Sequence, residues 1–241
     1  CYQARIRFGS QTATLDPEGE VVLEAPVPPI DSVLACLPRF TGPQNQIPPE
    51  YSAIHIDGRR AYERVLAGEK LDLQARPVTI HRLSPGTMKD GDFNLGVACS
   101  SGTYVRSLAR DLGIACGSAA HLVALRRESV GDFPVARAIC LPDRPEPWSI
   151  DLPPDAWIAG SRLALAIPGI GVREIKPLHL GDFRNGKAIH NDWFPRVHRD
   201  AGPGSDWAVI CGDEFAGIAT EHPDGWTYRL VFPVVAAAPN S

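Results

Sequence analysis

Apolar and polar side chains alternate from the first residues of the chain. The apolar positions are Tyr2, Ala4, Ile6 and Phe8, and the polar ones between them are Gln3, Arg5 and Arg7. A period of two predicts a strand with one buried face. A strand with no lead-in usually pairs with preceding chain. We therefore expect a sheet truncated at its N-terminus, with an unpaired edge at this strand.

From there to about residue 137, the apolar positions recur with a period of two in some segments and of about 3.6 residues in others. Strands are expected at 21–24, 77–83 and 93–99, with a turn at 85–91. Helices are expected to begin at Asp31 as N-cap and to cover 59–67 and 119–126. The residues 100–103 should open a further helix. Its buried stripe would consist of Val105, Leu108, Ala109 and Leu112.

The second part of the chain has a different composition. Residues 141–154 are rich in Pro and Asp, which is typical of a linker. Short β-like runs follow at 171–175, 187–190, 207–211, 215–219 and 226–232. Strands at this spacing predict a small β-barrel or sandwich, placed at 155–235.

Composition excludes several functional classes. No apolar run approaches the length of about 18 residues that a membrane span needs. The six cysteines are scattered without a CxxC pair, and the nearest Cys and His, Cys116 and His121, have no further ligands beside them. We expect reduced thiols, no metal and a cytoplasmic protein. Residues 1–140 carry equal numbers of basic and acidic side chains, so the net charge of −4 arises beyond them.

Three places combine unusual residue types. Tyr2 lies on the apolar face of the opening strand, where a tyrosine is most often part of the core. The loop 12–19 contains Asp16 and Glu18, which by themselves suit an ordinary Asx-type turn. The small residues 100–103 place backbone N–H groups at a helix N-terminus, which is a natural anion site. Arg106 in the first turn opposes the helix dipole, so it indicates a partner carboxylate or phosphate, unless it is a solvated surface arginine.

These places belong to a longer series of sequence blocks. The blocks are YQARIRFG (2–9), T-x-T-x-D-x-x-G-x-V (12–21), QIPPEYSA (46–53), GRRAYE (58–63), RPVTI (76–80), CSSGTYVR (99–106) and HL-x-x-LRR (121–127). In this order, over about residues 1–137, they resemble the TruB-type tRNA pseudouridine synthases. The C-terminal part resembles the small PUA-type β-barrel that this family appends.

The resemblance implies an α+β fold. A mixed, mostly antiparallel pseudouridine-synthase sheet with flanking helices would occupy residues 1–140, followed by a linker over 141–154. A PUA-like RNA-binding β-barrel would occupy 155–235. The implied reaction is the isomerisation of uridine to pseudouridine in the tRNA T-loop (position 55). It proceeds by base flipping and by cleavage and rejoining of the glycosidic bond. The implied partner is the T-loop and T-stem of tRNA, bound by a monomer without cofactor, metal or membrane.

The resemblance also assigns residue roles. Tyr2 matches the tyrosine that stacks on the flipped base and is a candidate for proton transfer. Tyr104 and Leu125 match residues that line the uridine pocket. Arg106 matches the arginine that pairs with the catalytic aspartate, and Asp16 matches a loop aspartate that completes this network.

One departure from the family pattern concerns the nucleophile. The family's nucleophilic aspartate lies in a G-H-x-G-x-L-D-P segment that precedes the tyrosine strand. Residues 14–17 (TLDP) imitate it but follow that strand. We expect the nucleophile segment upstream of this chain, and the chain alone to be inactive. One alternative is a non-catalytic tRNA-binding or folding protein. Another is a hydrolase built on Ser101, His121 and Asp16, although a G-x-S-x-G elbow is lacking.

Overall fold

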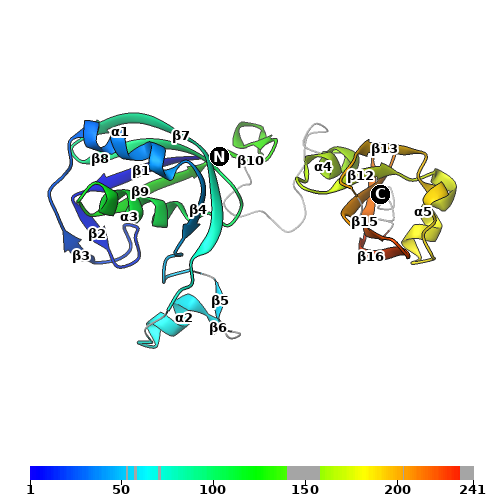
Figure 1. The fold of residues 1–241 in the computed structure, drawn as a ribbon, viewed down its shortest axis with the longest axis horizontal. Coiled ribbons are helices and arrows are strands. Elements are labelled where there is room, and N and C mark those ends of the chain that lie inside the picture. Colours follow the sequence, from blue (N-terminus) through cyan, green and yellow to red (C-terminus); the bar gives the residue numbers. More distant parts are fainter. Residues whose placement is uncertain (53, 57–58, 70–71, 140–157, 203, 234–241) are drawn as a thin grey trace, which may run out of the picture. The chain divides into compact units, whose positions relative to one another are not determined.

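The computed structural model describes residues 1–52, 54–56, 59–69, 72–139, 158–202 and 204–233. The chain divides into two compact units (Figure 1). The first comprises Cys1–Val130 and Pro134–Ala136, and the second comprises Gly131–Phe133 and Arg137–Ser241. The predicted linker 141–154 lies outside the described residues. The two units are considered separately below.

The first unit is built on a five-stranded sheet. Its strands lie in the order β4-β7-β8-β1-β9, and every neighbouring pair is antiparallel. The strands are β1 (Tyr2–Phe8), β4 (Gly42–Gln46), β7 (Arg76–Lys89), β8 (Asp92–Cys99) and β9 (Ala120–Arg127). The alternation of the first residues is confirmed, because Ala4, Ile6 and Phe8 are buried while the polar residues between them are exposed.

The opening strand is an interior strand of this sheet. β1 pairs with β8 on one side and with β9 on the other. Both partners follow it in the sequence. The prediction of an unpaired edge at this strand is therefore wrong, and β4 and β9 are the edge strands of the described sheet.

The segment 119–126 was expected to be helical and is a strand. Its Ala, Leu and Arg residues have high helix propensity, but β9 pairs with β1 along its length. The register places Leu122 beside Ile6 and Ala120 beside Phe8, so β9 adds its own buried residues to the core. Sheet pairing and burial outweigh the local preference here.

Two helices contribute to the core of the first unit. In α3 (Val105–Ala115) the predicted stripe Val105, Leu108, Ala109 and Leu112 is buried, as expected. α1 (Ile30–Cys36) begins after Pro29, so Asp31 lies in its first turn and is not the N-cap. α1 supplies Val33 to the same cluster of buried residues.

The remaining elements of this unit are short. β7 is longer than expected, and the chain turns into β8 at Asp90 and Gly91, whose positive φ angles suit a tight two-residue hairpin. The helix expected at 59–67 begins two residues later. The short elements of this unit are β2 (Ser10–Thr12), β3 (Val21–Glu24), η1 (Leu37–Phe40), β5 (His55–Ile56), β6 (Arg59–Arg60) and α2 (Ala61–Leu66). The chain at the boundary of the units forms β10 (Ser129–Val130), β11 (Phe133–Pro134) and η2 (Val135–Arg137).

The second unit contains another five-stranded sheet, in the order β13-β12-β14-β15-β16. Its elements are α4 (Gly160–Ala166), β12 (Gly171–Glu174), α5 (Pro177–Arg184), η4 (Asn191–Trp193), β13 (Arg196–Arg199), β14 (Asp206–Cys211), β15 (Glu214–His222) and β16 (Gly225–Val231). β12 and β14 are parallel, which makes this sheet mixed.

Four of the five β-like runs expected in this unit are strands. The run 187–190 is irregular, and β13 was not foreseen. Among the described residues the sheet runs from β13 to β16 without closing, so the expected barrel is an open sheet here. Trp207 and Phe183 are among the largest fully buried side chains of this unit.

Candidate active site

The site begins where β8 passes into α3. A turn at residues 100–103, with Gly102 at φ +79°, brings the chain to the N-terminus of the helix. Tyr104 is the N-cap residue, and no side-chain hydrogen bond of its own caps the helix. Arg106 follows in the first turn. The buried stripe of α3 faces the core, and this fixes the rotation of the helix about its axis.

Arg106 joins three segments that are distant in sequence. Its Nη1 donates to Asp16 Oδ2 at 2.7 Å and to the carbonyl of Thr14 at 3.0 Å. Its Nη2 donates to the carbonyl of Tyr51 at 2.9 Å. The side chains of Arg106 and Asp16 are only 25% and 22% exposed, so the ion pair is largely withdrawn from water. Such charge-assisted hydrogen bonds are the stronger ones in proteins.

The loop that carries Asp16 is held by its own contacts. Thr14 Oγ1 donates to Asp16 Oδ1 at 2.5 Å, and the N–H of Glu18 donates to the same oxygen at 3.2 Å. The latter is the Asx-type turn expected from the sequence. Leu15 is buried with φ 61°, which is unusual for a residue other than glycine. Its carbonyl accepts from Leu122 N–H at 3.1 Å, so the loop is attached to β9.

A second group of site residues lies on β1 and β9. Tyr2 is partly buried on the core-facing side of β1, and the guanidinium carbon of Arg127 lies 5.3 Å from the centre of its ring. On β9, Leu125 pairs with Ala4, which lies two residues after Tyr2 on β1, and Leu125 is 46% exposed. The pairing register of β1 and β9 places Tyr2, Leu125 and Arg127 on the same face of the sheet, where the large apolar side chain of Leu125 is left accessible.

The structure thus places the predicted site residues in two groups. Asp16 and Arg106 are in direct contact, and Tyr104 precedes Arg106 by two residues. Tyr2 and Leu125 lie on neighbouring strands. The contributions of Thr14 and of the Tyr51 carbonyl were not foreseen, although both residues lie within the sequence blocks. A backbone carbonyl leaves no signal in a sequence.

The residues of the hydrolase hypothesis make their contacts elsewhere. His121 is buried, and its Nδ1 lies 2.8 Å from the carbonyl of Ser10. Asp16 is bonded to Arg106 and to its own loop. Ser101 is exposed in the turn before α3. The described contacts therefore give no support to a nucleophilic serine assembled from these residues.

Metal and thiol chemistry find no support in the part of the chain that is described. No group of three or more His, Cys, Asp or Glu residues in it could hold a metal ion. Burial raises the pKa of the Cys116 thiol to about 12, and the neighbouring Cys36 thiol adds to this effect. A thiol of this kind stays protonated near neutral pH and is a poor nucleophile. In the same described residues, no helix is long and apolar enough to span a bilayer.

Comparison with known proteins decides the family. The family model described as TruB family pseudouridylate synthase (N terminal domain) matches residues 1–105. The tRNA pseudouridine synthase B of Parasynechococcus marenigrum is 36% identical over 92% of this chain and 72% of that protein. For its namesake in a Synechococcus strain these values are 42%, 93% and 73%. The chain belongs to the TruB family. The resemblance seen in the sequence blocks is confirmed.

The coverage of TruB relatives varies. The tRNA pseudouridine synthase B of Psychrobacter cryohalolentis is 44% identical over 59% of this chain and 40% of that protein. For Corynebacterium aurimucosum the values are 48%, 55% and 46%. The chain therefore spans less than half the length of these two TruB relatives in the matched regions.

Solved structures show the same fold at low sequence identity. A chain of an H/ACA ribonucleoprotein bound to a substrate RNA containing 2'-deoxyuridine matches with a TM-score of 0.64 and 16% identity. A chain of a Cbf5–Nop10–Gar1 complex matches with a TM-score of 0.63 and 19% identity. Each match covers 96% of this TruB chain and 65% of the other chain. The expected α+β fold class is confirmed.

Proposed function

We propose that the protein isomerises uridine to pseudouridine in the T-loop of tRNA, at position 55, and acts as a monomer. The observation that carries the proposal is the largely buried Arg106–Asp16 pair at the N-terminus of α3. It supplies the arginine–carboxylate network that this chemistry requires, in a TruB chain whose relatives are named tRNA pseudouridine synthase B.

The reaction requires no co-reactant. The bond between uridine N1 and C1' breaks, the base turns in the pocket, and a bond forms between C5 and C1'. A proton leaves C5 and N1 gains one, so atoms and electrons balance. The target base must first leave the folded loop, which costs a few kcal/mol. An aromatic ring and an apolar wall can offset this cost by contacts with the base.

The proposed roles follow from the positions of the side chains. Tyr2 offers its partly buried ring for stacking and its hydroxyl for proton transfer. The exposed Leu125 and the half-buried Tyr104 supply walls of the pocket. Arg106, held by Asp16, orients the nucleophilic carboxylate and keeps it ionised.

We further propose that this nucleophilic carboxylate lies outside residues 1–241. Asp16 stands in the string that imitates the family's nucleophile segment, but its carboxylate is occupied by Arg106, Thr14 and the N–H of Glu18. An aspartate held on both oxygens is suited to positioning and not to attack.

The function is tested by release of tritium from a T-loop RNA whose uridine carries tritium at C5. The full-length protein should release tritium from position 55, because the C5 proton leaves during isomerisation. The chain 1–241 alone should release none. Turnover by this chain would contradict the assignment of Asp16, since the nucleophile would then lie within it.

A non-catalytic tRNA-binding protein is the second candidate. It would bind the same RNA without releasing tritium, even in its full-length form. That result would overturn the enzymatic proposal and leave tRNA binding.

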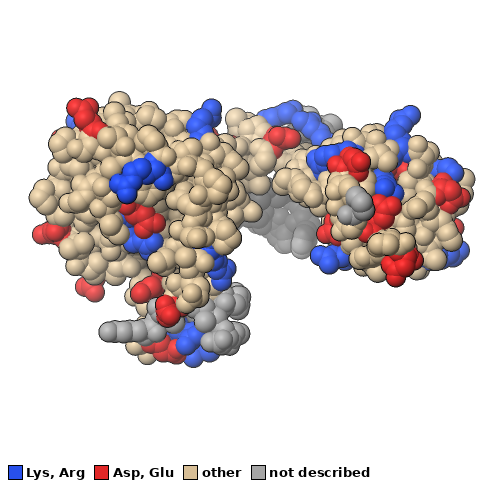
Figure 2. Space-filling view, in the orientation of Figure 1, with Lys and Arg blue, Asp and Glu red and all other residues tan. Residues whose placement is uncertain are grey.

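We also propose that the second unit is a PUA-like domain that contacts the RNA backbone. Residues beyond 140 carry the whole net charge of −4, and on the face drawn in Figure 2 acidic and basic side chains are interspersed. Its electrostatic contribution is therefore expected to be modest. Deletion of residues 155–241 should raise the Kd for tRNA by about 10-fold and slow the bound reaction less than threefold. Filter binding and single-turnover rates measure the two effects. Equal affinity with and without these residues would refute the assignment.

A further inference from the structure

The helix that carries Arg106 lacks a conventional N-terminal cap. The first four N–H groups of any helix have no partner within it, and usually a Ser, Thr, Asp or Asn side chain at the N-cap binds one or two of them. In α3 the N-cap residue is Tyr104, whose side chain cannot do so. The residue three positions later, which often reaches back to the N-cap N–H, is Ser107.

A side chain from β4 makes this second contact, the one to the N–H of the N-cap residue. Gln46 is the last residue of β4, and its Oε1 accepts the N–H of Tyr104 at 2.8 Å. Gln46 is only 3% exposed. Its backbone is fixed by pairing with Arg76 on β7. The acceptor is therefore carried by a buried residue of a paired strand, 58 residues away from its donor in the sequence.

The next residue extends the connection. The carbonyl of Ile47 accepts from Ser107 Oγ at 2.9 Å and from Arg110 Nη2 at 2.9 Å. Three donors of α3 and its N-cap thus meet acceptors of two consecutive residues, Gln46 at the end of β4 and Ile47 after it. Ser107 is fully buried, so its hydroxyl needs this partner.

These contacts fix the part of α3 that carries the site. Tyr104 and Arg106 flank the first helical residue, and a change in the path of the backbone at Tyr104 would move both side chains. The Arg106 fork must meet Asp16 and the carbonyls of Thr14 and Tyr51 at once. A guanidinium that must meet three acceptors at once tolerates little displacement, because hydrogen bonds weaken steeply with angle.

We propose that Gln46 is a positioning residue of the active site. Its side-chain carbonyl accepts the N–H of the N-cap residue, as the third helical residue does in a capping box, and thereby fixes the direction in which Tyr104 and Arg106 enter the site. This inference rests on the proposed function for its catalytic consequence, whereas the capping contact itself is testable without turnover.

The test compares Gln46→Met with Gln46→Glu in the full-length protein. The methionine side chain has a similar length but offers only a weakly accepting sulfur and ends in a methyl group. The glutamate carboxylate keeps a strong acceptor and is favoured at a helix N-terminus. We expect Gln46→Met to lower the single-turnover rate on T-loop RNA by about 10- to 100-fold, with the Kd for RNA changed less than threefold. Gln46→Glu should restore the rate to within about threefold of the wild type.

Gln44→Met is the matched control. Gln44 lies two residues earlier on β4, and its Nε2 donates to the carbonyl of Phe40 at 2.8 Å, without contact to α3 among its described hydrogen bonds. This variant also loses one side-chain hydrogen bond but should keep the wild-type rate. Equal losses in the two methionine variants would show that β4 acts only through general stability.

Hydrogen exchange at the Tyr104 amide separates the inference from the proposed function. Gln46→Met should speed this exchange by at least about 10-fold at a pH where the wild type is fully folded, and Gln46→Glu should not. Unchanged exchange would overturn the capping contact, whatever the activity. Faster exchange with an unchanged turnover rate would overturn the positioning role. A wild-type protein without turnover would instead overturn the proposed function.

Discussion

Replacement of Arg106 by alanine is expected to lower the single-turnover rate of the full-length protein by about 10²- to 10³-fold. The guanidinium joins Asp16 to the carbonyls of Thr14 and Tyr51, and its removal leaves a largely buried carboxylate without its charged partner. The Kd for tRNA should change less than threefold, since the side chain is used within the protein. Arg106→Lys should recover little of the rate, because an ammonium group cannot reproduce the planar fork.

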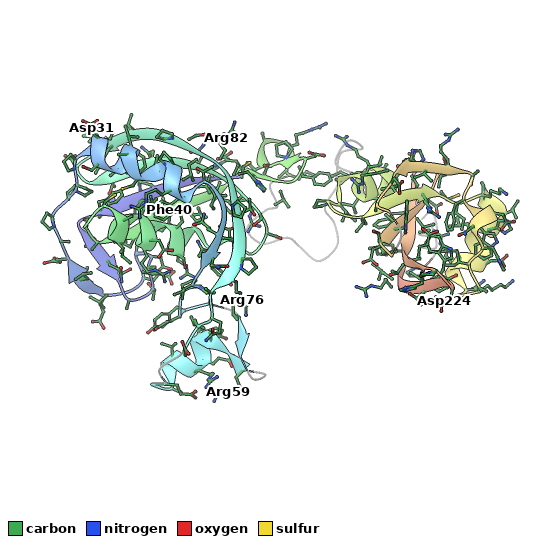
Figure 3. All side chains as sticks on the ribbon, in the orientation of Figure 1. Asp31, Phe40, Arg59, Arg76, Arg82 and Asp224 are labelled. Atoms are coloured by element: carbon green, nitrogen blue, oxygen red, sulfur yellow. The ribbon has the colours of Figure 1, made fainter. Side chains whose placement is uncertain are left out.

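Arg82→Ala is the control for this experiment. Arg82 is exposed on β7 (Figure 3) and has no place in the proposed site. The Arg82→Ala protein should bind RNA and turn it over as the wild type does. A loss of tRNA affinity in Arg106→Ala that matches its loss of rate would show that Arg106 binds phosphate and does not orient the nucleophile.

Replacement of Gly113 by alanine is expected to destabilise the first unit, although alanine is the better helix former. Gly113 lies in α3 where the helix meets β9. A Cβ at this position would lie 2.6 Å from the backbone nitrogen of Ala120 and 2.9 Å from the carbonyl carbon of Ala119. Backbone atoms cannot move aside as a side-chain tip can, so α3 must shift away from β9. Overpacking outweighs the gain in helix propensity, and we expect a net loss of about 2 kcal/mol in the free energy of unfolding.

Gly181→Ala makes the matched comparison. Gly181 lies within α5 in the second unit, and a Cβ there meets nothing within 4 Å. This variant should gain up to about 1 kcal/mol from helix propensity alone. All five tryptophans lie at residue 148 or beyond, so their fluorescence follows the second part of the chain only.

The two glycine variants should therefore move different signals. Gly113→Ala should lower the midpoint of the unfolding transition seen by far-UV circular dichroism and leave the fluorescence transition in place. Gly181→Ala should raise the midpoint of the unfolding transition seen by tryptophan fluorescence. A stabilised first unit in Gly113→Ala would contradict the close approach of α3 to β9.

The sequence by itself determined the elements whose pattern agrees with their environment. The alternation over residues 2–8 gave β1, and the stripe in 105–112 gave α3, because one face of each element is buried and the other is not. It also determined the family, because seven blocks of residues occur in the family's order. Arg106 was singled out since its charge opposes the helix dipole, and the structure gives it a carboxylate partner.

The tertiary structure alone decided features that depend on residues far apart in sequence. Residues 119–126 have a helical propensity that only pairing with β1 overrides, and β1 is an interior strand because both its partners come later in the chain. Asp16 and Arg106 are separated by 90 positions, and Tyr104 and Gln46 by 58. Local patterns record which face of an element is buried. They contain no information on which distant backbone group or side chain will meet it.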